Sequence, residues 1–185
     1  MFFSIIITLF LGSVIGIVTS VSVYGFITLV KFLTKVFRDP EKNIDSLNYI
    51  LENPSEFLLY IILIPSSVGL LVGWLRKFSL ESRWHGPPDV ILATHSEKKP
   101  LHIKSGFLTS FSSILSISAG GSVGQYGPLV HFGATIGAEI NNLFPKKTQY
   151  EIVVGAGVAS AISSGFGAPL AGLIFAREVI LRHQS

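Results

Sequence analysis

Three short segments combine glycine and proline in a way that suits anion binding. They are Gly86-Pro87-Pro88-Asp89 directly after His85, Gly124-Gln125-Tyr126-Gly127-Pro128 directly before Leu129, and Gly167-Ala168-Pro169. Proline is favoured in the first turn of a helix, and a helix start exposes N–H groups and a partial positive charge. Several helix starts that meet at the membrane midplane would bind an anion without a buried lysine or arginine. The alternative is that glycine and proline only permit kinks and tight packing.

Enzyme chemistry has no comparable pattern in the sequence. The motifs H-E-x-x-H and G-x-x-x-x-G-K are absent. The chain has no cysteine, which excludes disulfides, cysteine zinc sites and thiol redox chemistry. Its histidines do not cluster at the spacing of metal ligands: His85, His95, His102, His131 and His183. We therefore expect no catalytic residues, no metal and no cofactor, and we expect His131 to line a cavity or to be satisfied within an apolar helix.

The composition places these segments in a membrane protein. Of 185 residues, 49% are hydrophobic and only 14% are charged, and the mean hydropathy is +0.58. All charges lie in four clusters, and the uncharged stretches 2–30, 57–75, 105–138 and 152–176 separate them. A helix needs about 20 apolar residues to cross a bilayer. The pattern predicts an all-α, polytopic membrane protein, and a net charge of only +3 gives no stripe for nucleic acid.

Orientation follows from the lysines and arginines between the uncharged stretches. The cluster at residues 76–104 has six basic residues and the cluster at residues 31–56 has four. The positive-inside rule places the more basic cluster in the cytoplasm. We therefore expect a cytoplasmic N-terminus and an external loop at residues 31–56.

The uncharged stretches also predict how the helices bend, break and pack. Residues 2–30 are long enough that a helix must tilt, bend or extend into the interface, and Pro65 can kink the second stretch. The third and fourth stretches predict helix breaks at residues 120–128 and 165–169. Non-helical backbone at membrane depth must line a cavity or be buried in protein. Small-xxx-small pairs favour a close bundle: Gly12 with Gly16, Gly69 with Gly73, and Gly133 with Gly137.

Together these residues resemble a known family, the CLC chloride channels and chloride–proton antiporters. The segment from Gly124 to Pro128, continued by Leu129-Val130-His131-Phe132-Gly133, is similar to the G-R/K-E-G-P motif and its helix. The segment from Gly165 to Phe175 is similar to the F-N-A-P-L-A-G-x-L-F stretch, and His85-Gly86-Pro87-Pro88-Asp89 occupies the place of the G-S-G-I-P-E motif. The resemblance covers most of the first of the family's two inverted repeats.

The resemblance implies a fold of broken and re-entrant helices in one transmembrane domain over residues 1–185, with the second repeat absent. It implies chloride or a similar small anion as the transported ion, and it implies a homodimer or association with a complementary half. It assigns the anion site to His85, Gly86, Pro87, Gly124, Gln125, Tyr126, Gly127, Pro128 and Leu129. Helix starts around this site would hold the ion.

The side chains that distinguish exchange from passive flow depart from the family pattern. Tyr126 stands at the gating glutamate, Gln125 at the preceding basic residue, and His85 at the chloride-binding serine. Val179 stands at the proton-transfer glutamate, and Glu178 beside it is a possible substitute. We therefore expect passive, channel-like anion transport. The alternative is a truncated or degenerate membrane subunit that does not transport, and a membrane enzyme is the least favoured reading.

Overall fold

The computed structural model describes residues 2–38, 51–52, 54–79, 83–95, 101–122, 124–144 and 149–181. These parts of the chain contain helices and no strand, which confirms the all-α prediction. The α-helices are α1 (Phe2–Arg38), α3 (Pro54–Leu75), α4 (Pro87–His95), α5 (Ile103–Ser118), α6 (Tyr126–Leu143), α7 (Tyr150–Phe166) and α8 (Pro169–Phe175). A 3₁₀ turn η1 (Arg76–Phe78) and a π-helical turn η2 (Ala176–Ile180) complete the elements.

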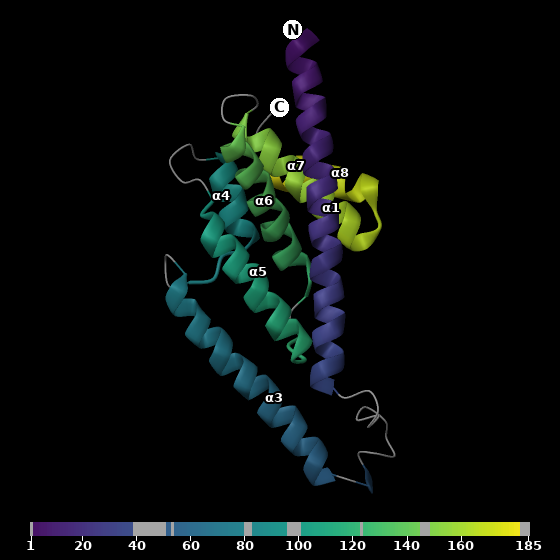
Figure 1. Ribbon diagram of the computed structural model, residues 1–185, viewed down its shortest axis with the longest axis vertical. Coiled ribbons are helices and arrows are strands. Elements are labelled where there is room, and N and C mark those ends of the chain that lie inside the picture. Colours follow the sequence, from purple (N-terminus) through teal and green to yellow (C-terminus); the bar gives the residue numbers. More distant parts are fainter. Residues whose placement is uncertain are drawn as a thin grey trace.

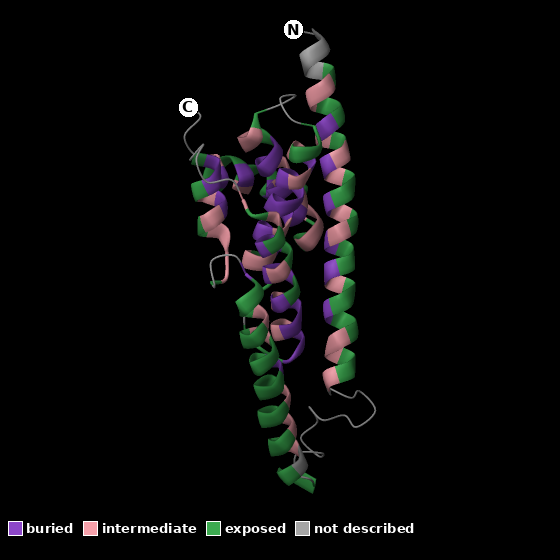
Figure 2. Ribbon diagram, turned by 60° about the vertical axis from the view of Figure 1, so that its left-hand side comes forward, coloured by how far each residue is buried: buried purple, intermediate pink, exposed green. Residues whose placement is uncertain are grey.

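Two helices, α1 and α3, are long and apolar enough to cross a membrane. The candidate spans are Ile6–Phe37 and Phe57–Phe78, and few of their residues are buried (Figure 2). At about 1.5 Å per residue, α1 exceeds the ~30 Å bilayer core, so an unbroken helix of this length must tilt or extend beyond the core. Figure 1 shows α1 continuous along the molecule, with α3 diverging from the bundle at its lower end. Helix α3 continues through Pro65 without a break.

The core lies where α6 and α7 cross, with α1 and α5 beside them (Figure 2). Glycines let these two backbones touch: a Cβ on Gly133 would lie 2.5 Å from the Gly157 carbonyl oxygen, and one on Gly137 would lie 2.5 Å from the Val153 carbonyl oxygen. Fully buried apolar residues such as Val154 surround this contact. Close backbone approach through small residues is how membrane helices gain packing energy without a hydrophobic driving force.

The other glycine pairs do not make such contacts within the described part of the chain. A Cβ on Gly12, Gly69 or Gly73 would meet no atom within 4 Å, and one on Gly16 would meet only the Ser160 hydroxyl at 3.8 Å. Of the three predicted packing pairs, only the pair on α6 packs closely. The reason is that Gly12, Gly69 and Gly73 face open space among the described residues, and Gly16 faces a side chain of α7 at ordinary contact distance.

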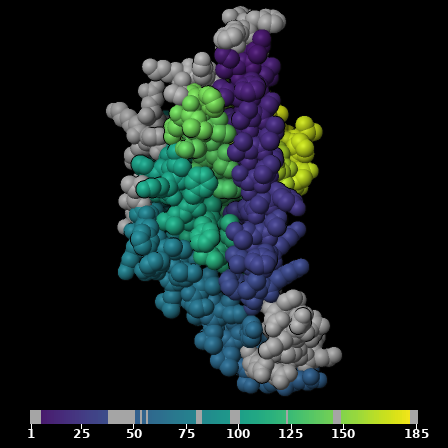
Figure 3. Space-filling model, viewed as in Figure 1, coloured from purple at the N-terminus to yellow at the C-terminus, as the bar shows by residue number. Residues whose placement is uncertain are grey.

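Both predicted helix breaks are present. Helix α5 ends at Ser118 and α6 begins at Tyr126, and Gly120 between them has a φ of 93°. Helix α7 ends at Phe166, Gly167 caps it with a φ of 63°, and Pro169 is the first residue of α8. Positive φ is a conformation that glycine adopts without steric cost. In the space-filling view, α8 emerges on the opposite side of α1 from α5 (Figure 3).

Candidate functional site

The starts of α4 and α6 lie against each other. A Cβ built on Gly127 would sit 3.7 Å from Cδ of Pro87, which is ordinary van der Waals contact. Pro87 is the first residue of α4, and Gly127 is the second residue of α6. Two segments that are about 40 residues apart in the sequence therefore bring two helix starts to one place, as the sequence indicated.

The start of α4 is already capped by its own side chain. Asp89 accepts a hydrogen bond from the backbone N–H of Gly86 at 2.8 Å, and Nη2 of Arg83 donates to the same carboxylate at 2.7 Å. This is the return half of a capping box, in which an acid at the third helical residue reaches back to the residue before the helix. Pro87 and Pro88 have no N–H to offer. The α4 start therefore presents a carboxylate rather than unsatisfied donors.

The charge on Asp89 is stabilised in this position, which lies outside the candidate spans α1 and α3. Burial alone would raise the pKa of the Asp89 carboxyl, but the hydrogen bonds from Arg83 and Gly86 and the positive charge of Arg83 together lower it below its ordinary value. Hydrogen bonds to the charged form favour ionisation. Asp89 therefore stays ionised at neutral pH.

The start of α6 carries no such cap. Gln125 precedes the helix and its side chain makes no capping hydrogen bond. The N–H groups of Tyr126 and Gly127 belong to the first turn, which has no intrahelical acceptor, and Pro128, the third helical residue, has no N–H. The N–H of Leu129 bonds to the Gln125 carbonyl oxygen at 3.1 Å. Within the part of the chain that the structure describes, two backbone donors and the positive end of an 18-residue helix thus remain at this point.

A pair of histidines lies beside the two helix starts. The imidazole rings of His85 and His131 have centroids 6.0 Å apart. His131 is 2% exposed, and its Nε2 has no hydrogen-bond partner among the described residues. The sequence placed His131 in an apolar helix but did not connect it with the site. The signal was its position four residues after Gly127, which puts both on one face of α6.

Tyr126 is held by aromatic rings from two other elements. Its ring lies 5.2 Å from that of Phe175 in an edge-to-face arrangement and 6.5 Å from that of Phe166. Phe166 ends α7 and Phe175 ends α8. Tyr126 remains 40% exposed. The Tyr126 side chain therefore packs against the second helix break rather than projecting freely.

The remaining predicted site residues divide between the surface and the core. Gly124 and Gln125 are exposed, whereas the Leu129 side chain is fully buried against Val23 and Phe26 of α1. Leu129 can therefore contribute its backbone to the site but not its side chain.

Val179 and Glu178 lie elsewhere, in the exposed part of η2. The hydroxyl of Thr94 is 3.1 Å from the carbonyl oxygen of Ile180, which joins η2 to the last turn of α4. Pro87 lies about 10 Å away along the α4 axis, at 1.5 Å per residue. Glu178 and Val179 are thus at the opposite end of α4 from the two helix starts.

The chemistry available here is electrostatic rather than covalent. Within the described ranges, no group of three or more histidine or carboxylate side chains could hold a metal ion. Free N–H groups at a helix start and nearby imidazoles favour a negative ligand. The α6 start is the part of the predicted anion site that has donors to offer.

Comparisons with known proteins agree with the sequence motifs. Residues 68–185 match the voltage gated chloride channel family. The chain is 33% identical over 171 residues to the chloride channel protein CLC-e of Arabidopsis thaliana, which covers 90% of this chain and 23% of that protein. It is 25% identical over 177 residues to the ClC-type chloride channel ClcB of Escherichia coli K12, which covers 93% of this chain and 41% of that protein.

A putative ClcB-like chloride channel protein of Ralstonia nicotianae is 28% identical over 127 residues, which is 64% of this chain and 29% of that protein. No solved structure matches the chain. The chain spans less than half the length of each of these relatives. The family match covers all the site segments described above and both helix breaks, and the chain belongs to the voltage-gated chloride channel family.

Proposed function

We propose that the chain forms one transmembrane domain of an integral, multi-pass anion-transport protein and carries chloride or a similar small anion passively. The observation that carries this proposal is the uncapped start of α6, where the N–H groups of Tyr126 and Gly127 have no intrahelical acceptor. Membership in a chloride channel family and the relatives' names support chloride as the ion. Nothing in the proposal requires catalysis or a cofactor.

In this proposal the ion rests at the α6 start, and His85 and His131 flank it. Asp89 lies close by, because Gly127 contacts Pro87 two residues before it. The carboxylate would repel an anion from the α4 start, so the α6 start supplies most of the attraction. Gly86 and Pro87 then act through the position of their helix rather than by donating to the ion.

The passive mode follows from the side chains at the two proton-handling positions. Tyr126 is a phenol, which ordinarily titrates near pH 10, and Val179 does not titrate at all. Neither can relay protons at neutral pH as a carboxylate does. The N-terminus and residues 76–104 face the cytoplasm in this proposal, and a second copy or a complementary half completes the pathway.

The second candidate is a membrane subunit that does not transport. The capped α4 start favours it, because Asp89 occupies the position where a helix start would otherwise attract an anion. The two candidates differ in one property: the first binds and conducts chloride at the α6 start, and the second does not.

The test is chloride efflux from vesicles that contain the chain, with Gly127→Asp compared with Gly127→Asn. A Cβ at position 127 is accommodated, since it meets Pro87 at 3.7 Å, and Asp and Asn have the same shape beyond it. A carboxylate in the first turn is favourable for the helix but occupies the anion's place. We expect Gly127→Asp to lower efflux about tenfold or more, equivalent to roughly 1.4 kcal/mol, and Gly127→Asn to retain most of it. Equal efflux from both variants would exclude the α6 start as the site, and no efflux from the unmodified chain would favour the subunit.

A further inference from the structure

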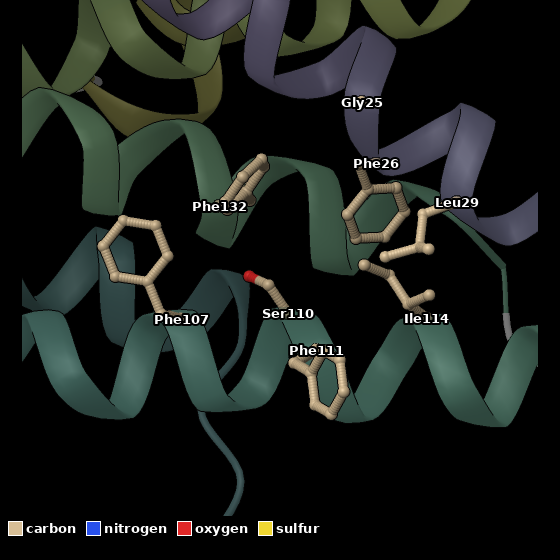
Figure 4. A pocket seen from close by; sticks show the side chains of 8 residues that line it. All are labelled: Gly25, Phe26, Leu29, Phe107, Ser110, Phe111, Ile114 and Phe132. Carbon is tan, nitrogen blue, oxygen red and sulfur yellow. The ribbon is translucent and has the colours of Figure 1, made fainter.

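An apolar groove runs between α1 and α5, with α6 as its floor (Figure 4). It has a volume of about 240 Å³. The residues that form it are Phe26 and Leu29 of α1, Phe107, Phe111 and Ile114 of α5, and Phe132 of α6. It is separate from the helix starts described above and uses none of their side chains.

The walls of the groove are held in place by ring contacts. The Phe132 ring lies 5.8 Å from that of Phe26 and 5.9 Å from that of Phe107. The hydroxyl of Ser110, which also lines the groove, donates to the Gly106 carbonyl oxygen at 2.9 Å and is turned to its own helix. The surface offered to an occupant is therefore hydrocarbon and aromatic, and it favours an occupant of the same kind.

Gly25 of α1 lies at the edge of the groove and leaves the groove open on that side, because it has no side chain. A Cβ on Gly25 would meet no atom within 4 Å. From this point, Leu29, Phe32 and Val36 follow on the same face of α1 at helical spacing, and all three are exposed. An apolar track thus continues from the groove toward the C-terminal end of α1.

Charged residues begin within the same stretch of α1. Lys31 and Lys35 are the first charged residues of the chain, and both are exposed. Gly25 precedes Lys35 by about 15 Å along the helix, at 1.5 Å per residue, and one leaflet is about half of the ~30 Å bilayer core. A lipid whose phosphate lies beside Lys35 therefore reaches the groove with the end of its acyl chain.

We propose that the groove binds the terminal part of a phospholipid acyl chain, with the lipid's phosphate at the level of Lys35. The level of the groove in the bilayer, its apolar lining and the positive charge of Lys35 one leaflet away all fit this one occupant. The site is a specific lipid site on the wall of the protein and does not depend on whether the chain conducts chloride.

The test uses phosphatidylglycerol that carries a photoreactive diazirine at the end of one acyl chain, in vesicles that contain the full chain. We expect cross-links to concentrate on residues 107–114 and on Phe132. Gly25→Leu fills the groove and should lower this labelling by about tenfold, since displacing about two methylene groups from an apolar site changes an equilibrium constant that much. Gly12→Leu is the matched control, because position 12 is on the same helix, also has open space, and lies outside the groove.

Three results would overturn the proposal. They are labelling spread evenly over α1 and α3, equal labelling of wild type and Gly25→Leu, or loss of labelling in Gly12→Leu as well. If circular dichroism shows that Gly25→Leu loses helicity, Leu29→Trp is tested instead, because it narrows the groove from the same helix. Photoreactive p-benzoylphenylalanine at position 111 distinguishes the occupants: an adduct of lipid mass supports the proposal, and an adduct with a protein chain shows that protein covers the groove instead.

Discussion

The carboxylate of Asp89 closes the start of α4 by accepting the backbone N–H of Gly86 at 2.8 Å. This contact fixes the turn that carries His85 next to the α6 start. We therefore expect Asp89→Ala to destabilise the protein by about 1 kcal/mol, the usual effect of losing a helix cap. Arg83→Gln should lower the free energy of unfolding by less than Asp89→Ala does. The Arg83 side chain is 47% exposed, and exposed ion pairs contribute little to stability. Denaturant unfolding in detergent, followed by circular dichroism, measures both.

Asp89 also predicts a pH dependence of stability. The pKa of this carboxyl is lowered in the folded protein, so its contribution is fully present above the unfolded-state pKa of about 3.9. It is lost as the pH falls through the folded-state pKa, because the unfolded chain then binds the proton more readily. Between pH 7 and pH 3, the free energy of unfolding should fall less in Asp89→Asn than in wild type. Denaturant unfolding curves measured across this range test the expectation. An identical pH profile in the two proteins would contradict this assignment.

The contact between α6 and α7 predicts a large effect from a very small change. Gly133→Ala places a methyl group 2.5 Å from the Gly157 carbonyl oxygen, and the helices must separate to accept it. We expect a loss of about 1–3 kcal/mol, the usual cost of overpacking. Gly73→Ala is the control, because a Cβ there meets nothing within 4 Å, and its unfolding midpoint should stay unchanged or rise. Equal midpoints for the two variants would show that α6 and α7 are not in backbone contact.

Passive transport predicts that chloride movement does not drive stoichiometric proton movement. The reason is the combination of Tyr126 with Val179, neither of which exchanges protons readily at neutral pH. A pH electrode on a suspension of reconstituted vesicles with a chloride gradient measures this directly. Uphill proton pumping that His85→Ala abolishes would assign proton transfer to the imidazole. Pumping that Tyr126→Phe abolishes would reject the passive reading.

The distribution of basic residues predicts the topology. Ser96→Cys should react with a membrane-impermeant thiol reagent only after the membrane is opened, and Ser46→Cys should react from outside. Both positions lie outside the described residues, and the chain has no native cysteine to interfere. The reverse labelling pattern would invert the proposed orientation.

Local sequence signals predicted the fold better than they predicted contacts. The break before α8 was readable because Gly167 and Pro169 restrict the backbone directly. The packing partners of the glycines could not be predicted from the sequence. Gly133 and Gly73 lie in similar motifs, and only the neighbouring helix distinguishes them. A spacing rule states which face a residue occupies, but tertiary contacts decide what lies against that face.

The candidate site shows the same division. The approach of Pro87 to Gly127 was expected from the motifs, but the sequence analysis gave Asp89 no role. Its position, three residues after Gly86, is the capping-box spacing and could have been recognised. The proximity of His131 to His85 depends on how α4 packs on α6, and neither segment alone carries that information.

The backbone contact between α6 and α7 has a mechanical consequence. Where Gly133 and Gly157 touch, backbone meets backbone without a side chain between them, so the two helices resist movement relative to each other. The α6 start is therefore fixed relative to α7, and Tyr126 rests against the ring that ends α7. If the proposed pathway opens at this point, we expect rotation of the Tyr126 side chain or sliding of α4 past the pair, which are small movements of the kind that packed helices permit.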